Sequence, residues 1–241
     1  MNLTPYYHLK LSNVDTCEIL EYVEALLQTD RAQLETLYFL NAHCFNISLK
    51  NTAYKNALLN SSHLLNDGIG IKIGAKRKSI ELKENMNGTD LIPKLLSSCA
   101  NANKKAFLLG ASDDVILKAR EHFQLQNPSL DIAGTHSGFF DDDQRICAMI
   151  NNSQADFLVI GMGVPRQELW LEENKHRLST IKLAVAGGAI FDFSAGEVSR
   201  APQWVQSMGL EWLYRFTQEP QRLFKRYFIG NIAFLLHIYR H

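Results

Sequence analysis

The sequence predicts an α/β fold, in which a doubly wound, mostly parallel, Rossmann-like sheet precedes a C-terminal helical appendage. Short apolar runs rich in β-forming residues alternate with segments of helical periodicity, the pattern of a parallel sheet covered by helices. From Pro202 onward the pattern is helical throughout, and aromatic side chains alternate with arginines. We therefore divide the 241 residues into an α/β body, residues 1–199, and a basic, aromatic appendage, residues 200–241.

The individual elements follow from the same patterns. Strands are predicted over residues 34–42, 63–67, 105–110, 130–135, 156–163 and 181–188. Helices are predicted between the later strands, over residues 112–126, 141–152 and 165–177, and Asn127-Pro128 ends the first of them. In the appendage, Pro202 and Pro220 mark expected helix starts.

Composition narrows the function classes. The 46% hydrophobic and 21% charged residues are ordinary for a globular protein. The formal net charge is zero, and the basic excess is confined to the appendage, which argues against nucleic acid as a partner. The four cysteines are scattered and form no C-x-x-C pair, so we expect free thiols in a reducing cytosol and no zinc site.

Two features of the sequence bear on how the protein lies relative to a membrane. The first residues lack the basic and apolar regions of a signal peptide. The longest apolar stretch, residues 227–239, is interrupted by Gly230, Asn231 and His237 and is shorter than the roughly 20 residues that span a bilayer. We expect a cytoplasmic protein that lies on a membrane surface without crossing it.

Two polar residues follow predicted strands. Asp67 comes after an apolar run and before Gly68, so it is expected at the carboxyl edge of the sheet, where ligands bind in open α/β folds. A carboxylate there can act as a general base toward a hydroxyl, although Asn-Asp-Gly is also an ordinary turn sequence. Asn41 ends an earlier strand and is either a ligand contact or a helix cap.

Two further segments carry two interpretations each. V-I-G-M-G-V-P-R-Q-E, residues 159–168, predicts a strand, a glycine turn and a helix start, which suits a phosphate or simply a tight turn. It lacks the G-x-G-x-x-G fingerprint of dinucleotide-binding sites, and the polar pair Gln167 and Glu168 favours a ligand. Asn-Gly-Thr-Asp, residues 87–90, is either a turn with Thr89 or Asp90 as N-cap or a sugar or phosphate contact.

Two charged clusters also have more than one interpretation each. Asp141 to Asp143 contain D-x-D, a metal-holding pattern, but they lead into a predicted helix, where acidic residues suit the N-terminus, so we favour capping. Arg215, Arg222 and Arg226 are seven and four residues apart, which places them on one face of a continuous helix. Such a cluster can grip a diphosphate or face anionic lipid, or it can be a solvated face over an aromatic core.

Taken together, the ordered blocks resemble the WecG/TagA/CpsF family of bacterial glycosyltransferases over approximately residues 34–234. The matching blocks are L-N-D-G-I-G-I, N-G-T-D-L-I-P-K-L-L, V-I-G-M-G-V-P-R-Q-E-L-W, G-G-A-I-F-D-F-S-A-G-E-V-S-R-A-P and G-L-E-W-L-Y-R followed by E-P-Q-R-L. Where many members carry an arginine and a threonine just before G-x-D-L, this chain has Asn85 and Asn87. The change removes a positive charge near the donor site and bears on the identity of the donor sugar, acidic sugars above all.

The resemblance implies an inverting transfer of N-acetylmannosamine or a related hexose from a UDP-sugar to a polyprenyl-diphosphate-linked sugar at the membrane, without a metal or other cofactor. Asp67 resembles the general base. The residues expected to bind substrate are Asn41, Gly88, Asp90, Gln167, Glu168, Arg200, Arg215, Arg222 and Arg226. A homo-oligomer is compatible with the sequence. The alternatives are a noncatalytic nucleotide-sugar or lipid-diphosphate binding module and, on the sheet pattern alone, a nicotinamide-dependent dehydrogenase.

Overall fold

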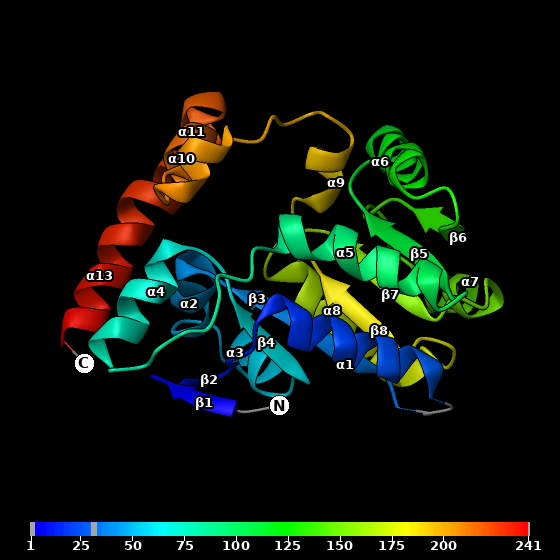
Figure 1. The fold of residues 1–241 in the computed structure, drawn as a ribbon, viewed down its shortest axis with the longest axis horizontal. Helices are drawn as coiled ribbons and strands as arrows, with labels where there is room; N and C mark the ends of the chain where they lie inside the picture. The colour runs from blue at the N-terminus through cyan, green and yellow to red at the C-terminus, as the bar shows by residue number, and fades with distance from the viewer. Residues whose placement is uncertain (1–2, 30–32, 241) are drawn as a thin grey trace.

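The structure is a computed structural model that describes residues 3–29 and 33–240. Within these residues a six-stranded sheet runs in the order β4-β3-β8-β7-β5-β6, and all its neighbouring strands are parallel (Figure 1). Its strands are β3 (Glu35–Leu40), β4 (His63–Asn66), β5 (Lys105–Gly110), β6 (Asp131–His136), β7 (Phe157–Gly161) and β8 (Leu183–Ala186). The predicted doubly wound α/β fold is confirmed, and the strand boundaries differ from the predicted ones by at most two residues.

Helices cover both faces of the sheet because its strands are apolar on both sides. Alternate residues of β3 point in opposite directions, so that Leu37 and Phe39 join one buried cluster and Tyr38 and Leu40 the other. The first cluster includes residues of α1 (Thr16–Gln28), α5 (Gly88–Asn101), α6 (Asp113–Gln126) and α9 (Ile190–Ser194). The second includes residues of α2 (Ala42–Ser48), α3 (Thr52–Leu59), α4 (Ile69–Arg77), α7 (Asp143–Asn152) and α8 (Arg166–Asn174), which continues as η1 (Lys175–Arg177).

An N-terminal hairpin was not predicted. β1 (Leu3–Tyr6) and β2 (Leu9–Ser12) pair antiparallel, and Tyr6 and Leu11 are fully buried in the second cluster. Each strand has only four residues, which is too short for an alternating pattern to stand out in the sequence.

The carboxyl edge of the sheet brings two polar residues together. In the pairing of β3 with β4, Leu40 lies opposite Asn66, so the next residues, Asn41 and Asp67, emerge side by side. Asn41 caps α2, and its side-chain oxygen accepts a hydrogen bond from the Cys44 N–H at 3.0 Å. The capping interpretation of Asn41 is therefore confirmed, and its amide nitrogen stays available for another contact.

The C-terminal segment forms α10 (Gln203–Ser207), α11 (Glu211–Gln218), α12 (Pro220–Phe224), the π-helical turn η2 (Lys225–Ile229) and α13 (Gly230–Arg240). Pro202 caps α10 and Pro220 opens α12, as predicted. Figure 1 shows α13 alongside α4, with α10 and α11 above it. None of the helices in the described part of the chain is long and apolar enough to span a bilayer.

α13 is fixed firmly to the body. Phe234 is 1% exposed and packs edge-on against Phe45 of α2, with 5.2 Å between the ring centroids. Near one end of the helix Asn46 donates a hydrogen bond to the Gly230 carbonyl at 2.7 Å, and near the other Arg77 Nε donates to the Ile238 carbonyl at 2.8 Å. Apolar burial and polar contacts at both ends therefore hold α13 in place.

We predict that Phe234→Ala lowers the free energy of unfolding by about 3 to 5 kcal/mol, because it removes a buried ring and leaves a cavity between α13 and α2. Leu236→Ala is the control on the same helix, since Leu236 is 52% exposed, and we expect a change within about 0.5 kcal/mol. Urea denaturation of the two variants measures both values. Equal stability of the Phe234 and Leu236 variants would contradict the packing.

Candidate active site

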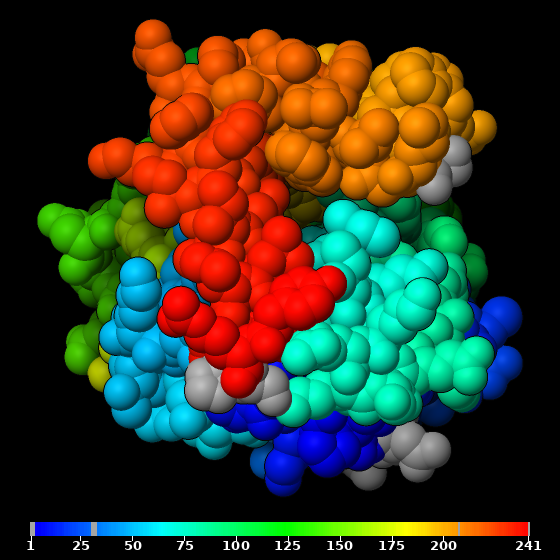
Figure 2. All heavy atoms as spheres, turned by 90° about the vertical axis from the view of Figure 1, so that its left-hand side faces the viewer, coloured from blue at the N-terminus to red at the C-terminus, as the bar shows by residue number. Residues whose placement is uncertain are grey.

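A pocket of about 510 Å³ lies between the carboxyl edge of β3 and β4 and the C-terminal helices. In Figure 2 the surface is hollowed beneath α10 and α11, beside α13. Polar side chains from both parts of the chain line the pocket: Asn41, His43, Asp67, Asn85, Asn87, Thr89, Gln206, Glu211, Arg215, Arg226 and Asn231. The pocket therefore requires the appendage as well as the sheet.

Asp67 has the environment of a base poised near neutral pH. Its side chain is partly buried, and Asn41 Nδ2 donates to Asp67 Oδ2 at 3.5 Å. Burial raises the pKa of Asp67 to about 6, against the hydrogen bond from Asn41, which lowers it. Glu211 also raises this pKa, and Arg226 and Arg215 lower it. At neutral pH the carboxylate is ionised and only weakly stabilised, so it is able to accept a proton.

The turn after Asp67 needs a glycine. Gly68 has φ of +88°, a conformation that L side chains rarely adopt, and it precedes α4. Its N–H donates to Asn85 Oδ1 at 2.7 Å. Asn85 thus ties the Asp67 turn to the segment before α5 and contributes an uncharged amide to the pocket.

Two arginines of the appendage face the same pocket. Arg215 on α11 lies over the Phe193 ring at 4.9 Å from its centroid, and Arg226 on η2 lies over the Tyr227 ring at 5.6 Å. The Nε atoms of both are buried and have no hydrogen-bond partner among the described residues. A buried donor without a partner is costly, so both guanidinium groups retain N–H groups that suit an anionic ligand such as a diphosphate.

Arg222 is not brought into this pocket. It is exposed and forms an ion pair with Glu219. The predicted common face assumed one continuous helix, but the backbone breaks at Glu219 (φ −132°, ψ 60°) and a π-helical turn follows α12. Both features rotate Arg222 relative to Arg215 and Arg226.

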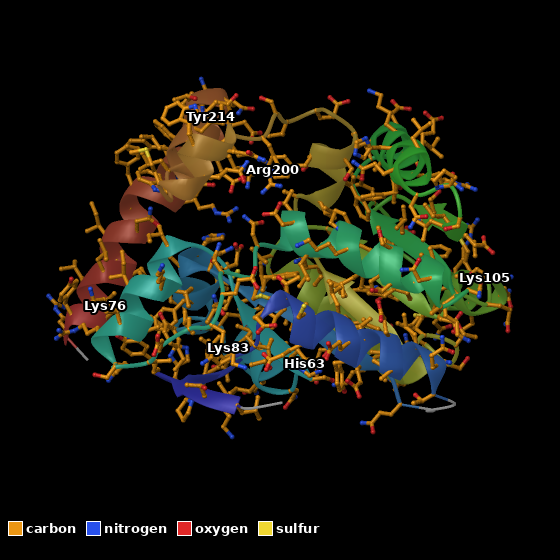
Figure 3. The ribbon with its side chains drawn as sticks, viewed as in Figure 1. His63, Lys76, Lys83, Lys105, Arg200 and Tyr214 are labelled. Carbon is orange, nitrogen blue, oxygen red and sulfur yellow. The ribbon has the colours of Figure 1, made fainter. Side chains whose placement is uncertain are left out.

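Arg200 and Asp90 bind each other outside the set of residues that line the pocket. The guanidinium of Arg200 donates to both carboxylate oxygens of Asp90, with 2.8 Å between Nη2 and Oδ2. Figure 3 places Arg200 between the appendage and the body. Gly88, the first residue of α5, is also absent from the pocket lining: a Cβ there would lie 3.2 Å from the ring of Phe39.

Gln167 and Glu168 lie beneath the surface, each about 1% exposed. Gln167 Oε1 accepts a hydrogen bond from the Gly163 N–H at 3.0 Å, and its Nε2 donates to Glu168 Oε1 at 2.9 Å. Burial raises the pKa of Glu168 to about 7. The pair thus supports the glycine turn between β7 and α8, and in this structure neither side chain lines the pocket.

The other acidic and polar motifs act as helix caps. Asp142 caps α7 by accepting from the Arg145 N–H at 2.9 Å, and Asp143 accepts from Trp170 Nε1 at 2.8 Å, which confirms the capping interpretation of this acidic run. In the segment before α5 the N-cap is Asn87, so the prediction of Thr89 or Asp90 as the cap is wrong. Among the described residues no group of three or more His, Cys, Asp or Glu side chains is arranged to hold a metal.

Sequence reasoning missed Glu211 and His43. Glu211 lies in the G-L-E-W-L-Y-R block, of which only the arginine was predicted to bind substrate. The signal that could have indicated Glu211 is that it is an acidic residue in a predominantly basic segment. His43 follows Asn41 by two residues in the first turn of α2. Burial, and then the charge of Arg226, lower the pKa of His43 to about 4, so its ring is neutral at physiological pH.

The comparisons with known proteins agree with this geometry. The family model described as glycosyl transferase WecG/TagA/CpsF family matches residues 5–241. The chain belongs to this family. Membership makes it a glycosyltransferase, and the pocket contains the candidate base and the candidate anion-binding residues that sugar transfer requires.

Three relatives of this WecG/TagA/CpsF member carry the name N-acetylglucosaminyldiphosphoundecaprenol N-acetyl-beta-D-mannosaminyltransferase. One from Bacillus spizizenii is 30% identical over 213 residues, covering 84% of this chain and 82% of the relative. One from Bacillus subtilis is 30% identical over 175 residues, covering 73% and 68%. One from Staphylococcus aureus strain MW2 is 24% identical over 212 residues, covering 88% and 83%.

We predict that Glu168→Gln stabilises the protein at alkaline pH. The unfolded carboxyl ionises near pH 4.5 and the folded one near pH 7. Ionisation of the buried group therefore costs stability progressively as the pH rises from about 4.5 to about 7. The variant removes this cost, so we expect it to be about 2 to 3 kcal/mol more stable than the parent at pH 8 and nearly equal at pH 4.5.

Urea denaturation at both pH values measures the difference. Glu173→Gln, an exposed position on the same helix, is the control. If the stability of the Glu168 variant depended on pH in the same way as that of the parent, the Glu168 carboxyl would have the same pKa in the folded and unfolded chains.

Proposed function

We propose that this glycosyltransferase moves N-acetylmannosamine or a related uncharged hexose from a UDP-sugar to a polyprenyl-diphosphate-linked sugar, with inversion, in bacterial cell-surface polysaccharide synthesis. The observation that carries the proposal is one pocket in which Asp67, with its raised pKa, faces Arg215 and Arg226. The names of the three relatives support the mannosamine donor and the undecaprenyl-diphosphate-linked N-acetylglucosamine acceptor.

The proposed reaction is a single displacement. The acceptor hydroxyl oxygen forms a bond to the anomeric carbon while the bond from that carbon to the UDP oxygen breaks on the opposite face, and Asp67 takes the hydroxyl proton. Arg215 and Arg226 bind the diphosphate and neutralise the negative charge that develops on the leaving oxygen. Asn41 orients the base through its hydrogen bond to Oδ2.

In this proposal the arginines supply the positive charge that a divalent cation supplies in other transferases. Two of the carboxylates that could have bound a cation are engaged elsewhere, since Asp142 caps α7 and Asp143 bonds to Trp170. We therefore propose a metal-independent transfer, for which activity in EDTA is the direct test.

The proposal places the protein on the inner face of the membrane that holds the acceptor. α12, η2 and α13 expose a set of large apolar side chains: Phe224, Phe228, Ile229, Ile232, Leu236 and Tyr239. Exposed Lys225 and Arg240 flank them. An apolar surface with basic neighbours suits the interface of an anionic bilayer, and it adjoins the pocket, whose lining includes Phe228 and Ile232.

The first experiment is UDP release from a panel of UDP-sugars with a short-chain polyprenyl-diphosphate N-acetylglucosamine acceptor, in EDTA. We expect acceptor-dependent release with one uncharged donor. Release only after magnesium or manganese is restored would refute metal independence. No release under any of these conditions would favour the noncatalytic binding module.

We predict that Asp67→Asn lowers kcat by about 10² to 10⁴, because the variant cannot accept the hydroxyl proton. UDP affinity, measured by calorimetry, should change little, since Asp67 acts on the acceptor. In the parent, log kcat/KM should fall as the pH drops through about 6, where Asp67 becomes protonated. Transfer that persists in the Asn variant would assign the base elsewhere.

We predict that Arg215→Ala and Arg226→Ala each weaken UDP binding and lower kcat/KM by about 10- to 100-fold, since each removes a charge-assisted contact. Lys225→Ala is the control, because Lys225 is exposed beside Arg226 and does not line the pocket. Calorimetry with UDP and initial rates measure both effects. Unchanged UDP affinity in both arginine variants would show that Arg215 and Arg226 do not bind the diphosphate.

A further inference from the structure

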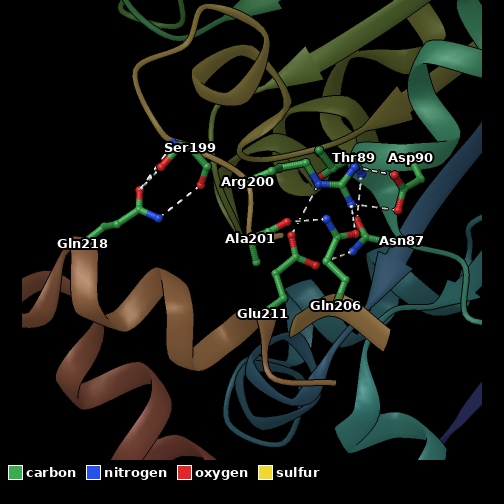
Figure 4. Close-up of polar contacts among 9 residues, drawn as sticks. All are labelled: Asn87, Thr89, Asp90, Ser199, Arg200, Ala201, Gln206, Glu211 and Gln218. Carbon is green, nitrogen blue, oxygen red and sulfur yellow. Dashed lines mark hydrogen bonds and ion pairs between the residues drawn. The ribbon is translucent and has the colours of Figure 1, made fainter. Parts of the chain in front are cut away.

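A polar network joins the body to the first helices of the appendage (Figure 4). Arg200 lies at its centre, in the segment between α9 and α10. It binds both oxygens of Asp90 at the start of α5, and its Nε lies 3.5 Å from Glu211 Oε1 on α11. One guanidinium therefore connects two carboxylates from two separate parts of the chain.

Further hydrogen bonds extend the network. Arg200 Nη2 donates to Gln206 Oε1 at 3.2 Å, and Gln206 Nε2 donates to the Ala201 carbonyl at 2.6 Å. Asn87 Nδ2 donates to Glu211 Oε2 at 3.2 Å, so each oxygen of this carboxylate has its own partner. The segment from α10 to α11, residues 203–218, is thus bonded to the body at the mouth of the pocket.

Other contacts also hold residues 203–218. Gln218 Nε2 donates to the Ser199 carbonyl at 3.1 Å, and Val205 of α10 is buried. Trp212 and Phe216 pack edge-on against Tyr227 and Phe228 of η2.

The Arg200 network matters because α11 itself is not packed into the core. α11 buries none of its described side chains, whereas α13 is fixed by the buried Phe234 and Ile238. α11 carries Arg215 and Glu211, two residues that line the pocket. Because α11 has no buried side chain, the position of these two groups over Asp67 depends in large part on polar contacts.

The N–H groups of Arg200 that contact neighbours are directed at protein acceptors. Arg200 is absent from the pocket lining, unlike Arg215 and Arg226. Its Nε, like theirs, is buried without a hydrogen-bond partner among the described residues, but it lies within ion-pair distance of Glu211, and the Nη atoms bond to Asp90 and Gln206. Its geometry is that of a structural tie, and a substrate diphosphate would have to displace Asp90 to reach it.

We propose that Arg200 is a positioning residue: with Asp90 and Glu211 it latches residues 203–218 over the pocket and keeps the Glu211 carboxylate paired beside the base. The proposal rests on the proposed transferase function for its kinetic consequences, but not for its structural one. It assigns Arg200 and Asp90 to closure of the site, where the sequence had suggested substrate contacts.

The latch has an electrostatic consequence at Asp67. Among the described residues, the charged or titratable groups that line the pocket with this base are Glu211 and Arg215 from α11, Arg226 and Tyr227 from η2, and His43 from α2, which is neutral near pH 6. Glu211 raises the pKa of Asp67, and Arg200 offsets the charge of Glu211. Loss of Arg200 should therefore raise the pKa of Asp67 further, whereas loss of the Glu211 charge should lower it.

The test compares Arg200→Gln, Asp90→Asn and Glu211→Gln with Lys118→Gln. The control removes the ion pair from Lys118 to Glu197, 2.7 Å long, which ties α6 to the same linker without contacting residues 203–218. Hydrogen exchange of the ligand-free proteins is measured first. We expect faster exchange in residues 203–218 for the Arg200 and Asp90 variants, parental exchange in α13, and parental exchange throughout for the control.

Kinetics supply the second readout. We expect Arg200→Gln and Asp90→Asn each to lower kcat/KM by about 10- to 100-fold, because Arg215 is misplaced. Since both changes break the same contact, the double variant should lose much less activity than the product of the two single losses. The acidic limb of the pH profile should move to higher pH in Arg200→Gln and to lower pH in Glu211→Gln. Arg200→Lys keeps the charge but not the bidentate contact with Asp90. We expect it to return the acidic limb to its parental pH and to recover part of the rate.

Two results would overturn the latch: parental exchange of residues 203–218 in the Arg200 and Asp90 variants, or acidic limbs that stay in place in both the Arg200 and Glu211 variants. Failure of the transferase proposal looks different. The parent would then release no UDP with any donor and acceptor, while the exchange measurement, which needs no substrate, would still decide whether the latch exists.

Discussion

The site depends on the register of two parallel strands. Because Leu40 pairs with Asn66, the chain leaves β3 and β4 at the same level, and Asn41 meets Asp67 at the carboxyl edge. A shift of one residue would turn one of these side chains toward the opposite face of the sheet. Buried residues on both faces of β3 and β4 hold this register, so the apolar core sets the geometry of the polar site.

Across the pocket, the body and the appendage supply complementary chemistry. The body contributes the partly buried carboxylate and a set of neutral amides, and the appendage contributes two arginines and one further carboxylate. Neither part alone contains both the candidate base and the anion-binding groups. The arrangement makes closure of residues 203–218 part of active-site assembly, and it places the pocket next to the exposed apolar residues of η2 and α13.

Local patterns anticipated much of this molecule, and the errors have specific causes. The six sheet strands and the capping role of Asp142 were predicted, because apolar runs and capping residues act over a few positions. The alignment of Arg222 with Arg215 was wrong, because the spacing argument assumed regular helix across Glu219. Asp90 and Arg200 were each predicted to bind substrate, whereas in the structure they bind each other. They lie 110 residues apart, so no spacing rule could show this pairing.

The sequence by itself determined the fold class, the family and the candidate base, since each depends on the order of short motifs along the chain. Only the tertiary structure decided which charges meet. Three features arise from how distant segments pack: the pairing of Arg200 with Asp90 and Glu211, the burial of Glu168, and the buried Nε atoms of Arg215 and Arg226, which have no hydrogen-bond partner in the described part of the chain. The physical reason is that burial and neighbouring charges control the availability of an ionisable group, and both depend on how the chain packs in three dimensions.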